Sequence, residues 1–277
     1  MSWISRQFPT RVIVLMPVAI AINIVLGFTV QKVLNLPIYL DSIGTILVGV
    51  LAGPIAGALT GILANLIWQV IQPSSNIGPF AITAGVIGLM AGIWGYLGVY
   101  RSRPASGASL YGAALVGVAI IAILAVRIYT SPAYKDPVNG YPEWVYVAIV
   151  VIAAAAAVMV GGFILLRRDT AGAWVAVAGA VTGIVAAIVS APIAAIVYEG
   201  VTGSGTDVIV AALRRGGADV YNASLGQGLF SDPIDKTITS FVVFIVLASL
   251  SPRVIARFPL GERLTAPEGG SRVARQA

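Results

Sequence analysis

The side chains in this sequence that could do chemistry are mostly carboxylates close to the ends of apolar segments. Cysteine and histidine are both absent, which removes disulfides, thiolate nucleophiles, the commonest general base and the commonest metal ligand. Asp41, Asp232 and Asp235 fall near segment ends on one predicted side, where they could hold a metal ion for chemistry on lipid. We keep this membrane-embedded lipid-modifying enzyme as an alternative. The main expectation is a protein that is not an enzyme and has no metal or other cofactor.

Lys236 is singled out by its predicted place in a helix. The last apolar run predicts a helix over residues 233–250, with Asp235 and Lys236 in its first turn. A carboxylate suits the positive N-terminal end of a helix, whereas a lysine opposes it. This mismatch makes Lys236 the better functional candidate of the two.

Two interpretations that involve phosphate groups fail. Residues 200–206 (GVTGSGT) have the glycine spacing of a P-loop, but Thr206 stands where the essential lysine is required. The sequence therefore predicts no site for nucleotide hydrolysis. The net charge of +6 is distributed over the ends of apolar runs, which is typical of membrane anchoring rather than of a nucleic-acid surface.

The elements that position these side chains are predicted to be membrane helices. The chain is 58% hydrophobic and only 10% charged, against roughly 25% charged residues in soluble domains. A spanning helix needs about 20 largely apolar residues. The apolar runs predict about eight helices, over residues 11–34, 41–53, 54–72, 79–100, 108–129, 144–166, 172–198 and 233–250. Asp41 and Ser42 stand where they could cap the second helix, and no ionisable residue falls in the middle of a predicted span, so a proton-coupled carrier would lack its relay.

Orientation follows from the basic residues. Most of the 17 lysine and arginine residues lie in the termini and in the connections that share their side, and these connections are short. Because basic residues favour the cytoplasmic side, we predict a multi-pass protein of the cell membrane with both termini in the cytoplasm. The connection over residues 199–232 and the carboxylates named above are then extracytoplasmic.

Glycines at four-residue spacing predict close helix packing. The two series are Gly49, Gly53, Gly57 and Gly61, and then Gly88 and Gly92. Small residues at this spacing let helix backbones approach closely in lipid. We therefore expect the second, third and fourth helices to form a tight bundle.

Three short segments carry a family resemblance. They are residues 37–45 (PIYLDSIGT) followed by Gly53-Pro54, residues 201–207 (VTGSGTD) and residues 231–236 (SDPIDK). In this order they resemble the S components of energy-coupling factor (ECF) transporters, in the branch that is riboflavin-type or unassigned. The resemblance covers residues 11–100 and 172–259 and omits residues 101–171.

The resemblance implies an all-α integral membrane protein with a six-helix S-component core. Residues 1–100 would supply helices one to four, 101–171 an inserted two-helix transmembrane hairpin, 172–259 the last two helices with a long extracytoplasmic loop, and 260–277 a disordered basic cytoplasmic tail. Such a subunit captures a vitamin-like molecule, riboflavin first, from outside. It delivers the molecule through a transmembrane T subunit powered by two separate cytoplasmic ATPases.

Residue roles also follow from the resemblance. The family binds its ligand through the first loop, the third loop and the ends of the later helices, and it docks on the T subunit through small residues of the first helix. The matching substrate-binding candidates are Tyr39, Asp41, Asn76, Thr83, Glu199 and Lys236, and the docking candidates are Pro17, Ala19, Ala21 and Asn23. Membrane lipid is an expected partner and nucleic acid is not.

Overall fold

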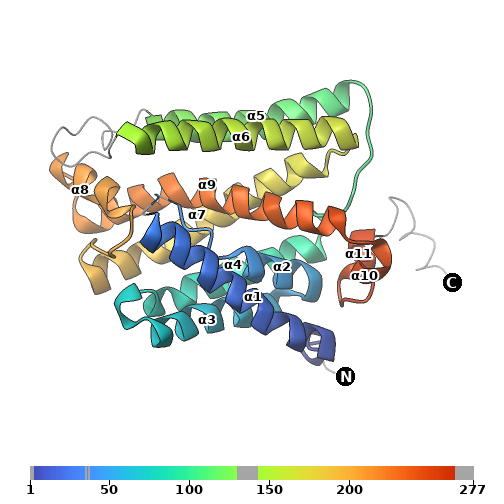
Figure 1. Ribbon diagram of the computed structural model, residues 1–277, viewed down its shortest axis with the longest axis horizontal. Helices are drawn as coiled ribbons and strands as arrows, with labels where there is room; N and C mark the ends of the chain where they lie inside the picture. The colour runs from blue at the N-terminus through green and yellow to red at the C-terminus, as the bar shows by residue number, and fades with distance from the viewer. Residues whose placement is uncertain (1–2, 35, 37, 130–142, 266–277) are drawn as a thin grey trace.

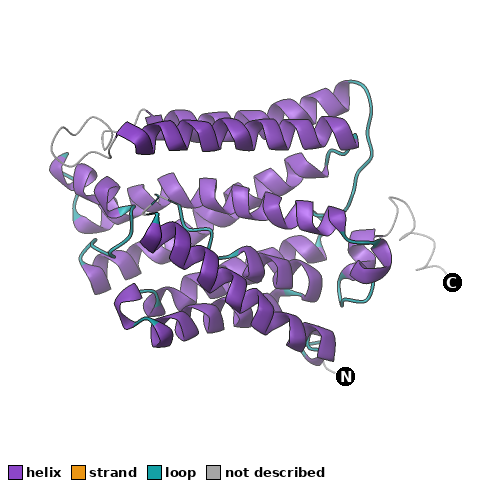
Figure 2. Cartoon of the chain, viewed as in Figure 1, coloured by secondary structure: helices purple, strands orange, loops and turns teal. Residues whose placement is uncertain are grey.

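The computed structural model describes residues 3–34, 36, 38–129 and 143–265. All regular elements over these residues are helices (Figure 1; Figure 2). The predicted all-α class is therefore confirmed over these residues. The helices are α1 (Thr10–Phe28, continued by a π-helical turn, Thr29–Val33), α2 (Ile43–Ala52), α3 (Pro54–Ile71), α4 (Ala81–Tyr96), α5 (Ala108–Tyr129), α6 (Glu143–Arg167), α7 (Ala171–Tyr198), α8 (Asp207–Arg215), α9 (Val220–Ser249), α10 (Pro252–Ile255) and α11 (Gly261–Thr265). Short 3₁₀ turns, η3 (Pro73–Ser75) and η4 (Gly78–Phe80), join α3 to α4.

Four helical segments of the described chain are long and apolar enough to cross a membrane. They are Thr10–Val33, Pro54–Ile71, Gly78–Tyr96 and Ala171–Tyr198. Each has at least 18 residues, close to the roughly 20 that a bilayer requires. The predicted membrane character is confirmed at this level.

Glycines set the contact between α2, α3 and α4. A Cβ added at Gly88 would lie 2.2 Å from the carbonyl carbon of Gly57, and one at Gly92 would lie 2.2 Å from the nitrogen of Pro54. A Cβ at Gly61 would lie 2.4 Å from the carbonyl oxygen of Ala84. These backbones touch directly because no side chain separates them, so the predicted tight bundle is confirmed.

The α5–α6 pair lies along the outside of α7 and α9 (Figure 1). Phe163 of α6 packs edge-on against Phe241 and Phe244 of α9, with ring centroids 5.8 and 5.4 Å apart. The two ends of the predicted insertion meet, since the Ala105 N–H donates to the Arg168 carbonyl at 2.8 Å. The pair therefore leaves and rejoins the rest of the bundle at one place.

The last long helix begins earlier than predicted. Residue 233 was expected to start it, but α9 begins at Val220, after Asp219, whose carboxylate accepts the Asn222 N–H at 2.9 Å as an N-cap. Pro233 lies inside the helix, where a proline removes one hydrogen bond without ending the helix if packing holds both sides. Gly183 of α7 provides that packing, because a Cβ there would lie 2.4 Å from the Pro233 Cα. The predicted long loop over residues 199–232 is therefore wrong, and most of it is α8 and the first part of α9.

The predicted disordered tail, 260–277, is also corrected at its start. The Leu260 N–H donates to the Leu51 carbonyl at 2.9 Å, and Gly261 and Leu264 of α11 are buried. Apolar contact with the end of the bundle orders this turn despite its polar composition. Residues 266–277 lie outside the described residues.

The described parts nearest the two termini lie at the same end of the bundle (Figure 1). The Arg11 guanidinium donates to the Arg257 carbonyl at 2.8 Å, which joins the start of α1 to the C-terminal segment. The connections over residues 38–42, 72–80 and 199–206 lie at the opposite end. This arrangement agrees with termini that share one side; which side that is stays a prediction.

Candidate ligand-binding cavity

A cavity opens among the connections at the end of the bundle opposite the termini. Its cavity volume is about 90 Å³, below the roughly 300–1,000 Å³ of sites that enclose a drug-sized molecule, so it fits a small molecule or one part of a larger one. Its polar lining is Gln31, Lys32, Tyr39, Asp41, Ser42, Asn65, Ser75, Asn76, Thr83, Ser190, Thr202, Ser204, Ser224, Gln227, Asp232 and Lys236, and its apolar lining is Ile77, Phe80, Ala84, Ile87, Ala186 and Ala194. Polar groups placed around an apolar surface are what a site for a small organic molecule requires.

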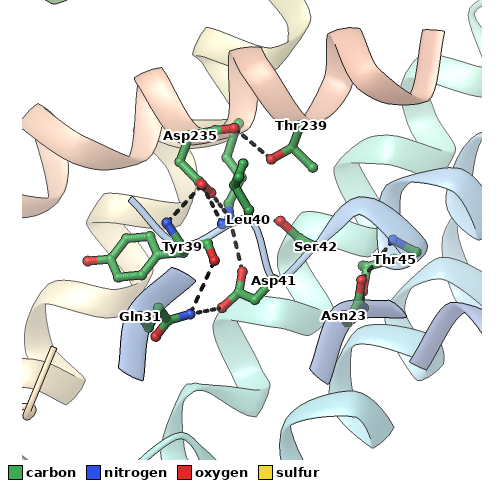
Figure 3. A network of polar contacts seen from close by, with 11 residues as sticks. Asn23, Gln31, Tyr39, Leu40, Asp41, Ser42, Thr45, Asp235 and Thr239 are labelled. Carbon is green, nitrogen blue, oxygen red and sulfur yellow. Dashed lines mark hydrogen bonds and ion pairs between the residues drawn. The ribbon is translucent and has the colours of Figure 1, made fainter. Parts of the chain in front are cut away.

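A buried ionic network fixes the connection between α1 and α2 against α9. The Lys236 ammonium donates to the Ser42 hydroxyl at 2.8 Å and pairs with Asp235 and with Asp41, the latter at 3.5 Å. Gln31 donates to the second oxygen of Asp41 at 3.1 Å (Figure 3). The network ties three segments together: the end of α1, the start of α2 and the middle of α9.

The Asp235 carboxylate also holds the connection between α1 and α2, because it accepts hydrogen bonds from the backbone of that connection. One carboxylate oxygen accepts the N–H groups of Tyr39 and Leu40 at 3.0 and 2.7 Å (Figure 3). Leu40 has a φ of 51°, a left-handed conformation that costs a non-glycine residue about 1–3 kcal/mol. The charge-assisted bonds from both amides offset this strain, so Asp235 is a structural anchor as well as the partner of Lys236.

The Tyr39 hydroxyl joins this wall of the cavity to the connection that follows α7. It donates to Thr206 Oγ1 at 3.2 Å and accepts from the Gln227 amide at 3.0 Å. The Lys32 ammonium donates to the Gly203 carbonyl at 2.8 Å. Hydrogen bonds from Lys32 and Tyr39, which both line the cavity, therefore hold the segment over residues 203–206.

Five of the six predicted substrate-binding residues meet at the cavity: Tyr39, Asp41, Asn76, Thr83 and Lys236. Glu199 does not line it. Glu199 is exposed and adopts a left-handed φ of 52° as the C-cap of α7. Glu199 therefore does not join the other five at this cavity, and its binding role stays a prediction.

Lys236 was predicted to be functional because it was expected at the start of a helix, and the structure contradicts that reason. Lys236 lies in the middle of α9, not in the first turn of a helix, so the helix dipole does not act on it as expected. Asp232, Asp235 and Lys236 are all buried within this 30-residue helix. Because α9 is not among the four segments that are apolar enough to cross a membrane, these residues do not contradict the expectation that no ionisable residue lies in the middle of a predicted span.

Two lining residues, Ser224 and Gln227, were missed because the start of α9 was misplaced. Ser224, Gln227 and Ser231 recur at spacings of three and four residues and share one helix face. The Gln227 amide donates to Ser231 Oγ at 2.6 Å. Interpreted as a helix, residues 220–232 would have revealed this polar stripe. Ser75 and Gln31 offered no comparable periodic signal.

The four predicted docking residues of α1 lie on two different faces of the helix, and their docking role stays a prediction. Ala19 and Asn23 are buried, with exposed fractions of 0% and 1%. Asn23 donates to Thr45 Oγ1 at 2.8 Å and accepts the Gly44 N–H at 2.7 Å (Figure 3), so this face of α1 packs against α2 of the same chain. Pro17 and Ala21 are exposed.

The carboxylates do not assemble into a metal site. Over the residues with described positions, no group of three Asp, Glu, His or Cys side chains is arranged to hold a metal ion. Asp235 is instead occupied by Lys236 and two backbone amides. The geometry thus gives the lipid-modifying alternative no carboxylate triad.

Comparison with known proteins adds no relative, because no family model, curated protein or solved structure matches this chain. Any functional conclusion therefore depends on the chemistry of the cavity and on its place in the fold.

Proposed function

We propose that this chain is the substrate-binding subunit of an ECF-type importer of the cell membrane. The observation that carries the proposal is the cavity, which lies at the end of an apolar helical bundle opposite the termini. If the termini are cytoplasmic, the cavity faces outside. It would take up a vitamin-like small molecule there, and riboflavin is the first molecule to test.

The proposal assigns energy coupling to other subunits. The chain has no P-loop, because Thr206 occupies the lysine position and its hydroxyl instead bonds to Tyr39. A transmembrane T subunit and two cytoplasmic ATPases would drive release. With Ala19 and Asn23 buried, we assign docking to the exposed face of α1 that includes Val14, Pro17 and Ala21.

Native purification in mild detergent tests this function. We expect a small organic compound to elute with the chain, together with a membrane subunit and ATPases, and mass spectrometry identifies all of them. A matched preparation of the Thr83→Trp variant, which fills the cavity, should lose the compound and keep the subunits. A bound lipid with slow turnover, or no organic compound at all, would count against the proposal.

A further inference from the structure

The cavity has more buried negative than positive charge. Asp41, Asp232 and Lys236 line its inner wall, and Asp235, which does not line the cavity, pairs with Lys236. Three carboxylates thus lie around one ammonium. Lys236 is saturated by Asp235, Asp41 and Ser42. Its three N–H donors are therefore used, and it attracts Asp232 only through space, without a hydrogen bond.

Asp232 is the carboxylate without a partner. It is 6% exposed and lines the cavity, yet within the described part of the chain it makes no hydrogen bond and no ion pair. The next cation, Lys32, lies at the mouth, where it binds the Gly203 carbonyl and is attracted by Asp207. A buried carboxylate without a partner is unfavourable by several kcal/mol, so it either takes up a proton or is joined by a cation.

Three buried hydroxyls around the same cavity also have unused hydrogen-bonding capacity. The Oγ atoms of Ser75 and Ser224 and the Oγ1 of Thr83 have no partner in the described structure, and all three residues line the cavity. They come from η3, α9 and α4, so they surround the space rather than form one patch. Buried polar groups are normally paired, and a bound molecule would pair these.

From these observations we propose that the cavity binds an organic cation, with Asp232 as the counter-ion to a protonated nitrogen. The hydroxyls of Ser75, Thr83 and Ser224 bond to polar groups of the same molecule, and its flat apolar part lies against Phe80 and Ile87. This inference rests on the proposed capture function and narrows its substrate class. It favours cationic heterocycles and amines over riboflavin, which is neutral and offers Asp232 no ion pair.

The test compares benzamidine, a cation at neutral pH, with benzamide, its neutral isostere. The full chain is placed in nanodiscs of phosphatidylcholine, which has no net charge to attract the cation, and binding is measured by calorimetry or ligand-observed NMR. We expect benzamidine to bind more tightly than benzamide. Asp232→Asn should weaken benzamidine roughly 10- to 100-fold, the usual contribution of a hydrogen bond to a charged group, and leave benzamide unchanged.

Two controls keep the test independent of misfolding. Glu262→Gln removes an exposed carboxylate on α11, at the far end of the bundle, and should bind both probes as the wild type does. Asp232→Asn without ligand should unfold at a temperature equal to or above that of the wild type, because an unpaired buried charge is gone. Ser224→Ala should give a smaller loss for both probes.

Each result decides the inference separately from the capture function. If benzamidine binds no better than benzamide, or if Asp232→Asn leaves its affinity unchanged, the cation proposal is overturned. If riboflavin binds wild type and Asp232→Asn equally well, the capture function stands and the cation proposal falls. Binding of sodium or potassium alone, shown by calorimetry with the chloride salts, also overturns it.

Discussion

At the residue scale, two aspartates of α9, Asp232 and Asp235, have opposite roles although they lie within four positions of each other. Asp235 is fully buried and completes its bonding with Lys236 and two backbone amides, whereas Asp232 faces the cavity unpaired. Removing one partner of a buried ion pair leaves the other charge stranded. Removing an unpaired charge relieves the same penalty. The two aspartates should therefore respond oppositely to neutralisation.

Asp235→Asn should destabilise the protein by about 3–5 kcal/mol, the usual result of breaking a buried pair. It should also loosen the connection around Leu40, because an amide oxygen accepts the two backbone N–H groups more weakly than a carboxylate does. Thermal unfolding in detergent measures the stability, and limited proteolysis between α1 and α2 measures the release. The double variant Asp235→Asn/Lys236→Met should recover part of the loss; an Asp235→Asn variant as stable as wild type would show that the pair is not structural.

Glu199 gives a residue-scale prediction of the opposite kind. Because Glu199 is exposed and lies outside the cavity lining, Glu199→Gln should leave small-molecule binding unchanged. Glu199→Gly should raise stability by up to about 1 kcal/mol, since glycine adopts a φ of 52° without strain. Binding and thermal unfolding of both variants check this, and a loss of binding in Glu199→Gln would return this residue to the site.

At the element scale, sequence patterns predicted helices well wherever apolar length decided the outcome. The predicted segments over residues 54–72 and 172–198 differ by one residue from α3 and α7. The pattern failed at Pro233, because packing against Gly183 decides whether a proline ends a helix and that contact is invisible in sequence. The same error hid Ser224 and Gln227. At the start of α2, Ser42 stands at the N-cap as predicted but its hydroxyl binds Lys236 instead of capping.

Gly88 tests the packing of α3 on α4. Gly88→Ala places a methyl group 2.2 Å from the Gly57 backbone, which cannot yield as a side chain does, so the helices must separate. We expect a loss of roughly 1–3 kcal/mol, as overpacking produces. Gly112→Ala in α5 is the matched control, because a Cβ there meets nothing within 4 Å. It should be neutral or stabilise by up to about 1 kcal/mol, and equal effects of the two changes would contradict the contact.

At the scale of the whole molecule, function depends on which side of the membrane the cavity faces. The chain has no cysteine, so single cysteines report their own accessibility. Val201 is 69% exposed near the cavity mouth, and Ser251 is exposed at the end that holds both termini. With cytoplasmic termini, a membrane-impermeant maleimide should label Val201→Cys in intact cells and label Ser251→Cys only after lysis. The reverse pattern would place the cavity in the cytoplasm, where a subunit that captures nutrients from outside could not work. Labelling of both from outside would mean that the two ends do not lie on opposite sides of a membrane.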